Sequence, residues 1–490
     1  MSDKPPAEAV TATVKFPHRS RRGILLGLTA PQLITVGVVG LLLFAVILAR
    51  GVTGALQLIP LWAAAALFVF FRYRGRALAE WAPIVTRYVL RRMRGQLVWL
   101  TRPSRRPVRE GLLHLPGTAA SLRVITSPAG RYGAVHNPHT STLTAVVKVS
   151  SRAYALLDPG TQNANVNGWG RALAALARTG QIARIQVIER TVPDSGDALR
   201  RYWEENGHPD APVAGALYGE LIQNAGPAAA PHEAYVAIAL DTKAARRLIN
   251  QAGGGLTGSF SVLAQLTSTF DQAARTAGLN PTGWLTATEI AAVVRTAYDP
   301  KALSALDRWS PAGRPEADPA AAGPVVVVEK ADHIATDSAV HATYWVENWP
   351  RTETSAGFLH QVLFTAGVRR TLSLSYEPKD LDAALRDVQR KKASVIADAA
   401  ERARRGQVDS EADSVEYQDI KSRERQLISG HADVALTGLL TVSADSEEEL
   451  RSACAVVETA AVGAQIDLRP LTWQQAEAFT VAAMPLGLAA

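Results

Sequence analysis

The chain has 490 residues, one cysteine, and 52 basic against 45 acidic side chains, which gives a formal net charge of +7. Hydrophobic residues make up 47% of it and charged residues 20%, a composition that excludes a disordered polymer and a fibre. The length allows roughly two to four domains, and the lone Cys454 excludes an intramolecular disulfide and any multi-cysteine metal site.

The basic residues are concentrated at the N-terminus. Residues 1–110 hold 17 basic and four acidic side chains, a net charge of +13, whereas the other 380 residues have a net charge of −6. A positive balance suggests a nucleic-acid partner or an anionic membrane surface. Because a nucleic-acid-binding domain normally carries its own positive patch, and the larger part of this chain is mildly acidic, we expect no direct contact with nucleic acid.

Two apolar runs follow a basic N-terminus over 1–30. Residues 31–49 carry no charge and would reach roughly 28 Å as a helix, close to the thickness of a bilayer core. Residues 55–71 form a second run, and only Arg50 is charged between them. The pattern predicts a transmembrane helical hairpin over 31–72 in the inner (plasma) membrane, multi-pass, with both termini cytoplasmic. The flanking basic residues are Arg19, Arg21, Arg22, Arg72, Arg74, Arg76, Arg87, Arg91, Arg92 and Arg94.

Residues 73–110 have the pattern of a basic juxtamembrane helix. Trp81, Val85 and Val89 share one helical face, and most of the arginines lie on the other. Such a segment either lies on the anionic inner leaflet or packs as an ordinary helix on the following domain. The sequence leaves both interpretations open.

From residue 111 onward the pattern is mixed α/β. We predict a first α/β repeat over 111–312, a linker over 313–323 that is rich in Pro, Ala and Gly, and a second repeat over 324–490. Predicted strands cover 142–149, 182–191, 235–240, 341–346, 371–376, 434–442 and 464–468. Predicted helices cover 166–178, 197–206, 212–225, 260–277, 287–297, 356–364, 446–460 and the stretch from 472.

The two halves repeat one order of elements, and residues 184–194 share a local pattern with residues 370–380. The predicted fold class is therefore α/β (α+β), a cytoplasmic domain of two ferredoxin-like β-α-β repeats. The second repeat contains a highly charged insertion over 379–429, read as two antiparallel helices. Its thin apolar stripe either docks a partner or, more commonly, joins the two helices.

No motif in the sequence supplies an active site. A Gly-Lys dipeptide is absent, which excludes a Walker-type ATPase. Residues 253–258 match the letters GxGxxG but follow a helical pattern instead of a strand. His136 and His139 flank an Asn-Pro turn without further ligands nearby, and Cys454 is most simply a small buried hydrophobe. We therefore predict no catalytic, cofactor-binding or metal-binding residue, no cofactor, and a protein that is not an enzyme.

Two regions resemble known families. Residues 16–33, which lead straight into the hairpin, resemble the PrgI family, small inner-membrane components of Gram-positive type IV secretion and conjugation machines. The stretch Gly-Leu-Thr-Ala-Pro-Gln-Leu over 27–33 carries most of this likeness. Residues 427–487 resemble the end of the N-terminal domain of the large type IV secretion ATPase, on residues 438–442, 449–450, Leu471, 474–475, Phe479 and 484–487.

The resemblance implies a split form of that ATPase, because its P-loop domain would follow the Pro-Leu-Gly segment and this chain stops at Ala490. It implies a non-catalytic inner-membrane subunit of a type IV secretion-like, conjugal transfer apparatus, oligomeric within a complex. Its partners would be the membrane, a separate P-loop ATPase and other channel subunits. One alternative is a type VII secretion membrane component, and another is a membrane-tethered enzyme that uses the His136 and His139 region.

Overall fold

A computed structural model of the chain divides into two compact units, Pro17–Val98 and Met1–Phe16 together with Trp99–Ala490. The basic residues Arg19, Arg21, Arg22 and Arg74 lie outside the described residues, as do most of the predicted N-terminal segment and part of the helix expected over 197–206. The segment boundaries predicted from the sequence stay predictions. The structure describes residues 13–14, 16, 28–73, 75–101, 110–151, 154–192, 203–207, 213–225, 232–309, 314–404, 411–428 and 432–489.

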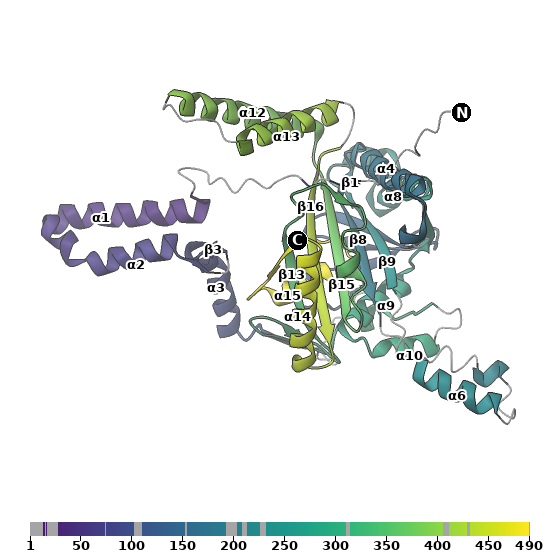
Figure 1. Ribbon diagram of the computed structural model, residues 1–490. Helices are drawn as coiled ribbons and strands as arrows, with labels where there is room; N and C mark the ends of the chain where they lie inside the picture. Colours follow the sequence, from purple (N-terminus) through teal and green to yellow (C-terminus); the bar gives the residue numbers. More distant parts are fainter. Residues whose placement is uncertain are drawn as a thin grey trace, which may run out of the picture. The chain divides into compact units, whose positions relative to one another are not determined.

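The unit Pro17–Val98 is built around an apolar helical hairpin. Helix α1 (Ala30–Gln57) is followed, after a turn at Leu58, by the antiparallel helix α2 (Ile59–Phe70), as Figure 1 shows. A short ribbon of β2 (Arg72–Tyr73) and β3 (Arg76–Ala77) then leads into α3 (Leu78–Met93). The predicted hairpin is thus present as two helices of unequal length.

The prediction of two membrane spans is supported for the first helix only. Among the described residues α1 alone is long and apolar enough to cross a membrane. Helix α2 has 12 residues, or about 18 Å of rise, which is short of the roughly 20 residues that a span needs. The apolar run over 55–71 is divided because its first residues complete α1, while Pro60 lies in the first turn of a new helix, where proline is favoured.

The second unit folds around one large antiparallel sheet of 13 strands. The order across the sheet is β4-β11-β12-β13-β16-β15-β8-β9-β7-β6-β5, with β10 beside β7 and β17 beside β13. A separate pair joins β1 (Thr13–Val14) to β14 (Thr354–Ser355). The strands of the large sheet are β4 (Val98–Leu100), β5 (Arg123–Thr126), β6 (Gly133–Asn137), β7 (Thr142–Ser151), β8 (Ile182–Thr191), β9 (His232–Asp241), β10 (Leu279–Trp284), β11 (Val326–Glu329), β12 (Ile334–Ala335), β13 (Val340–Asn348), β15 (Arg369–Pro378), β16 (Val434–Ala444) and β17 (Asp467–Pro470).

Helices cover both faces of this sheet. Val146 and Val147 are neighbours in β7 but belong to different cores, because successive strand residues point to opposite faces. The Val147 face packs against α4 and α8 and, in the second half, against α11 and α14; the Val146 face packs against α9 and α15. The helices of this unit are α4 (Pro159–Ala177), α6 (Ala214–Ala225), α7 (Arg246–Gln251), α8 (Gly255–Thr276), α9 (Ala287–Tyr298), α10 (Ala302–Trp309), α11 (His360–Leu363), α12 (Leu381–Arg404), α13 (Glu411–Ile428), α14 (Glu447–Gly463) and α15 (Gln475–Ala482).

The two halves of the sheet have the same strand order. The first half places its strands as β10-β7-β9-β8 and the second as β17-β13-β16-β15. They meet where β8 pairs antiparallel with β15, in a register that sets Val187 opposite Leu374. Helix α6 follows β8, and the helices α12 and α13 follow β15, so these two insertions leave the sheet at opposite ends (Figure 1).

The mixed α/β prediction is confirmed. The predicted strands match strands of the sheet, except that the one predicted over 464–468 shares only its last two residues with β17. The two helices predicted over 379–429 are present as α12 and α13, and they share a small core of Ala384, Val388 and Leu427. The sequence did not indicate β5, β6, β10, β11 or β12. Strand β10 contains Pro281 and Gly283 and is irregular between them, which is why it reads as a loop.

Candidate functional sites

The surface of α1 is the first candidate site. Its large apolar side chains are mostly exposed, and Leu41, near the middle of the helix, is 71% exposed. An apolar surface of this extent needs a bilayer or a protein partner. Two polar side chains of the hairpin are meanwhile satisfied internally: the Gln32 side chain donates to the Val69 carbonyl (2.8 Å), and the Trp62 indole donates to the Ala55 carbonyl (3.0 Å). Internal satisfaction of polar groups is what a hydrocarbon environment requires.

Gly51 introduces a bend within α1. Its φ of +68° is a conformation that glycine adopts without steric cost. The straight part of α1 therefore ends at Arg50, after 21 residues from Ala30, which rise by about 31 Å and match the hydrocarbon thickness.

The junction of β8 and β15 is the second candidate site, and we call it the central junction. Here Gln186 is fully buried, and its amide donates to Ser373 Oγ (3.0 Å), the Val481 carbonyl (2.9 Å) and the Met484 carbonyl (3.2 Å). Its Oε1 accepts from the Gly487 N–H (2.9 Å). Arg184 pairs with Glu377 and donates to the Gly487 carbonyl. One strand of the first half thus holds both the second half and the C-terminal segment.

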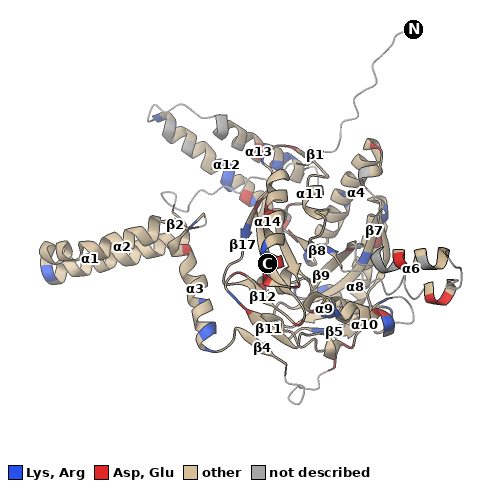
Figure 2. Cartoon of the chain, turned by 60° about the horizontal axis from the view of Figure 1, so that its bottom comes forward, with Lys and Arg blue, Asp and Glu red and all other residues tan. Residues whose placement is uncertain are grey.

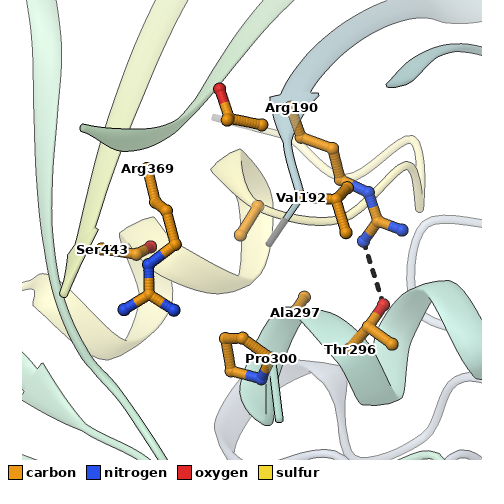
Figure 3. Close-up of a pocket in the computed structure, with 9 residues that line it drawn as sticks. Arg190, Val192, Thr296, Ala297, Pro300, Arg369 and Ser443 are labelled. Carbon is orange, nitrogen blue, oxygen red and sulfur yellow. Dashed lines mark hydrogen bonds between the residues drawn. The ribbon is translucent and has the colours of Figure 1, made fainter. Parts of the chain in front are cut away.

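A small cavity lies at one end of the central junction (Figure 3). Arg190 reaches it from β8 and Arg369 from β15, with Ser443 of β16 beside Arg369. The cavity volume is about 40 Å³, room for a few water molecules and much less than the several hundred Å³ of a cofactor site. The lining residues are Arg190, Thr191, Val192, Thr296, Ala297, Pro300, Arg369, Ser443 and Ala483.

Both arginines of the cavity are paired. The Arg190 guanidinium donates to Glu233 Oε2 from Nη2 (2.7 Å) and Nε (2.9 Å), and to Thr296 Oγ1 (3.1 Å); Arg369 pairs with Asp445. Burial opposes ionisation of Glu233, but the charges of Arg190 and Lys148 outweigh it and hold the pKa of Glu233 at about 2. The arrangement is therefore a buried ion pair with a structural role.

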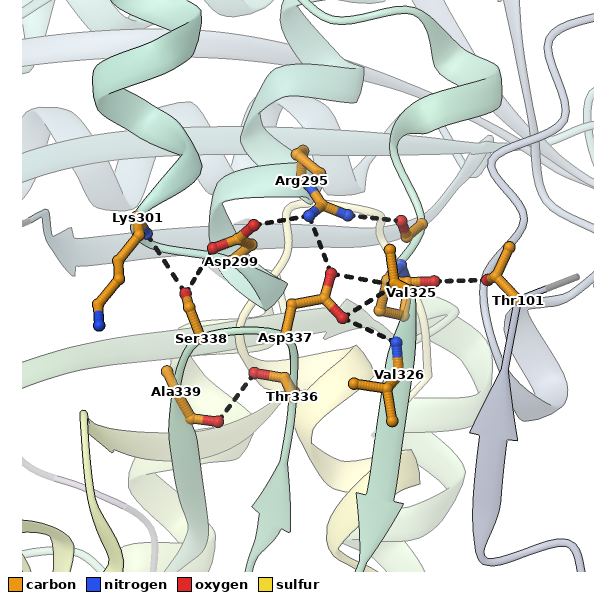
Figure 4. Close-up of polar contacts among 12 residues, drawn as sticks. Thr101, Arg295, Asp299, Lys301, Val325, Val326, Thr336, Asp337, Ser338 and Ala339 are labelled. Carbon is orange, nitrogen blue, oxygen red and sulfur yellow. Dashed lines mark hydrogen bonds and ion pairs between the residues drawn. The ribbon is translucent and has the colours of Figure 1, made fainter. Parts of the chain in front are cut away.

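A polar cluster around Asp337, here called the Asp337 clamp, joins α9 of the first half to the start of β11 in the second half (Figure 4). The Asp337 carboxylate accepts from the backbone N–H groups of Val325 (2.9 Å) and Val326 (2.7 Å). It also pairs with Arg295 of α9 (2.9 Å), which in turn pairs with Asp299 (2.6 Å). A carboxylate with these partners fixes the start of β11 against α9.

Replacing Asp337 by alanine is expected to lower the free energy of unfolding by roughly 2–3 kcal/mol, because two backbone donors lose their acceptor and Arg295 loses one of its two carboxylate partners. Asp318→Ala is a matched control, since Asp318 is exposed and caps a short 3₁₀ helix through one bond to the Ala320 N–H (2.8 Å); it should cost about 1 kcal/mol or less. Urea denaturation of the detergent-solubilised chain measures both. Equal losses for the two variants would contradict the assignment.

The residues that the sequence analysis considered for chemistry do not converge. His136 lies in β6 and His139 in the following turn, where its N–H donates to the Asn137 side chain (3.0 Å). Gly253 and Gly254 form the turn between α7 and α8, as their helical context predicted. Cys454 is half-buried against the core of the second half, and burial raises the pKa of its thiol. No group of three or more His, Cys, Asp or Glu residues suited to a metal ion occurs in the part of the chain that the structure describes.

Sequence reasoning missed the central junction and the Asp337 clamp. A signal for the first was present: Arg184, Gln186 and Arg190 are polar residues on one face of a strand that is rich in apolar residues. Residues at even spacing lie on one face of a strand, and in a strand covered on both faces polar groups need internal partners.

A family model described as EccE, a putative type VII ESX secretion system translocon, matches residues 228–346. The matched stretch runs from the strand β9 to β13 and includes the Arg295, Asp299 and Asp337 side chains of the clamp. No curated protein matches the chain.

This match corrects the family resemblance drawn from the sequence. The likeness to the PrgI family and to the N-terminal domain of the type IV secretion ATPase is wrong, because the family that matches is a type VII translocon component. The short motifs that suggested it have packing roles instead. Residues 438–442 lie in the central strand β16. Gly487 has a φ of +64°, and a Cβ there would lie 2.8 Å from Thr144 Oγ1. Packing constraints of this kind recur in unrelated sheets and do not identify a family.

Proposed function

We propose that this chain is a non-catalytic membrane subunit of a type VII secretion translocon. The observation that carries the proposal is the EccE match over residues 228–346, which is supported by the exposed apolar surface of α1. Membership of a translocon implies other membrane subunits as partners. In this function α1 anchors the chain, and the sheet unit is a scaffold on which those subunits assemble.

In this proposal the sheet unit lies in the cytoplasm. Arg72 and Arg76 follow α2, whereas the only charged residue toward the opposite end of the hairpin is Arg50, which lies in α1 just before the bend at Gly51. Excess basic charge beside the ends of apolar helices favours the cytoplasmic side. With both ends of the hairpin on one side, α2 would have to return through the bilayer or sit within it beside α1.

We also infer that the two halves of the sheet are duplicated ferredoxin-like repeats. Taking each half's strands in chain order, β7, β8, β9 and β10 lie in the spatial order 4-1-3-2, and β13, β15, β16 and β17 lie in the same order. Each half also carries its helical insertion between the second and third of these strands. This is the connectivity of a β-α-β-β-α-β unit. A duplicated scaffold would offer two related surfaces to partner subunits.

The absence of catalysis and of a cofactor remains part of the proposal. A separate P-loop ATPase as a direct partner, and the lack of direct contact with nucleic acid, stay predictions from the sequence.

Deleting the gene and isolating the tagged chain from native membranes test the proposal. We expect the deletion to abolish export of type VII substrates, and we expect the tagged protein to co-purify with other type VII membrane subunits. Wild-type protein should restore export, and Leu41→Arg should not, because a charge at the centre of a membrane helix opposes insertion by about 3 kcal/mol. Leu156→Arg is the control, since Leu156 is 86% exposed on the sheet unit. Unimpaired export in the deletion strain, or isolation with conjugation proteins instead, would overturn the proposal.

A further inference from the structure

Helix α3 runs crosswise to the hairpin of α1 and α2, and both Figure 1 and Figure 2 show this arrangement within the N-terminal unit. Its start is fixed by Trp81, which is buried, donates from its indole to the Tyr73 carbonyl (3.0 Å) and meets the Tyr73 ring edge-to-face. The direction of α3 is therefore set by the short ribbon that follows α2.

The hairpin places the start of α3 at one boundary of the apolar region. The bond from the Gln32 side chain to the Val69 carbonyl ties the beginning of α1 to the end of α2. The start of α1 and the end of α2 therefore lie at the same level, and α3 begins after only seven intervening residues. If α1 crosses the bilayer, a helix that starts at this level and runs crosswise lies along the membrane surface.

The far part of α3 combines positive charge with exposed apolar side chains. Arg87, Arg91 and Arg92 lie in its last two turns and Arg94 at its C-cap, while its one acidic residue, Glu80, is in the first turn. The blue colour at the end of α3 in Figure 2 marks this charge. Val89, Leu90 and Met93 are exposed among the arginines, and Met93 is 78% exposed. Basic and apolar side chains interleaved in this way suit the interface between headgroups and acyl chains.

We propose that α3 is an interfacial helix that binds anionic phospholipid headgroups through Arg87, Arg91, Arg92 and Arg94. The occupant follows from charge complementarity, because the cytoplasmic leaflet carries negative lipids and attracts juxtamembrane basic residues. Arginine binds phosphate through a planar, bidentate fork. Binding at the surface would hold α3 in the membrane plane. The inference rests on the proposed membrane anchoring by α1.

Lipid-contact quenching in nanodiscs tests the inference with the full chain. In a Cys454→Ser background, a fluorophore is attached at Met93→Cys, and in a second protein at Leu41→Cys within α1. The discs contain brominated phosphatidylcholine, either with or without phosphatidylglycerol. We expect quenching at Met93→Cys to be at least about twofold stronger with phosphatidylglycerol. The excess should disappear when salt rises from about 0.15 M to about 1 M, because salt screens exposed charges.

Charge-removal variants give the matched comparison. Replacing Arg87, Arg91, Arg92 and Arg94 by glutamine should abolish the effect of phosphatidylglycerol. Replacing four exposed basic residues of the sheet unit by glutamine removes the same number of charges and should leave the effect of phosphatidylglycerol on quenching unchanged. These residues are Arg171, Lys243, Arg246 and Arg247. Quenching at Leu41→Cys should be strong in every disc. If quenching at Leu41→Cys is strong but quenching at Met93→Cys does not depend on phosphatidylglycerol, α3 packs on protein. The inference about α3 then fails, and the membrane anchoring by α1 still holds. If neither position is quenched, the membrane anchoring fails as well.

Discussion

Replacing Arg190 by methionine is expected to lower the free energy of unfolding by about 3–5 kcal/mol, the cost of leaving a buried partner charge uncompensated. The Arg190 side chain is only 8% exposed, and it makes two of the bonds that Glu233 accepts. Without it, Glu233 keeps only Lys148 (2.7 Å) and the Tyr235 hydroxyl (2.8 Å). Urea denaturation of the solubilised chain at neutral pH measures the loss.

Lys148→Met is the control for this prediction. Lys148 bonds the same carboxylate, but its side chain is 43% exposed, so water can replace it, and the cost should be about 1 kcal/mol or less. Losses of similar size for the two variants would show that burial does not determine how much the Arg190–Glu233 pair contributes to the free energy of unfolding.

Acid titration gives a second readout of the same pair. The pKa of Glu233 is held at about 2 in the folded chain, below its ordinary value of 4.5. A group with a depressed pKa contributes stability that is present above its unfolded pKa and is lost as the pH falls through its folded pKa. The wild-type chain should therefore lose up to about 3 kcal/mol from this group between pH 4.5 and pH 2. A Glu233→Gln variant should lack this part of the pH dependence.

The sequence predicted those parts of the fold that depend on local pattern. The strands β7 and β8 are dense in β-branched residues, and their predicted bounds agree with the structure to within two residues. The prediction failed where one residue redirects the chain. A new helix starts with Pro60 in its first turn, which leaves α2 too short to be a standard span. Pro281 and Gly283 give the sequence of β10 the pattern of a loop.

The candidate sites were beyond sequence reasoning for a different reason. The partners of Gln186 lie between 187 and 301 residues away in the chain, and Asp337 acts through backbone N–H groups, which every residue except proline offers. Nothing local in the sequence reports such pairings. The polar residues on one face of β8 could have shown that buried polar groups needed partners, but they could not have shown which ones.

Gln186→Leu is expected to cost about 3 kcal/mol or more and to release the C-terminal segment. The substitution keeps the volume of a fully buried side chain but removes four hydrogen bonds, to Ser373, Val481, Met484 and Gly487. Each buried group left without a partner costs about 1–3 kcal/mol. Gln162→Leu is the control, because Gln162 bonds two carbonyls at the half-buried start of α4 (3.0 and 3.1 Å) and connects no distant elements.

Hydrogen exchange separates the central junction from a general loss of stability. The Gly487 N–H bonds to Gln186 Oε1 alone among side chains, and its carbonyl accepts from Arg184. In Gln186→Leu the Gly487 amide should therefore exchange by local opening, faster than the amides of β8 and β15 that surround it. In Gln162→Leu it should exchange as in the wild type. If Gly487 keeps its protection while β8 loses its own, the C-terminal segment is held by the apolar contacts of Met484 and Leu486, and the polar junction is not what joins it to the two halves.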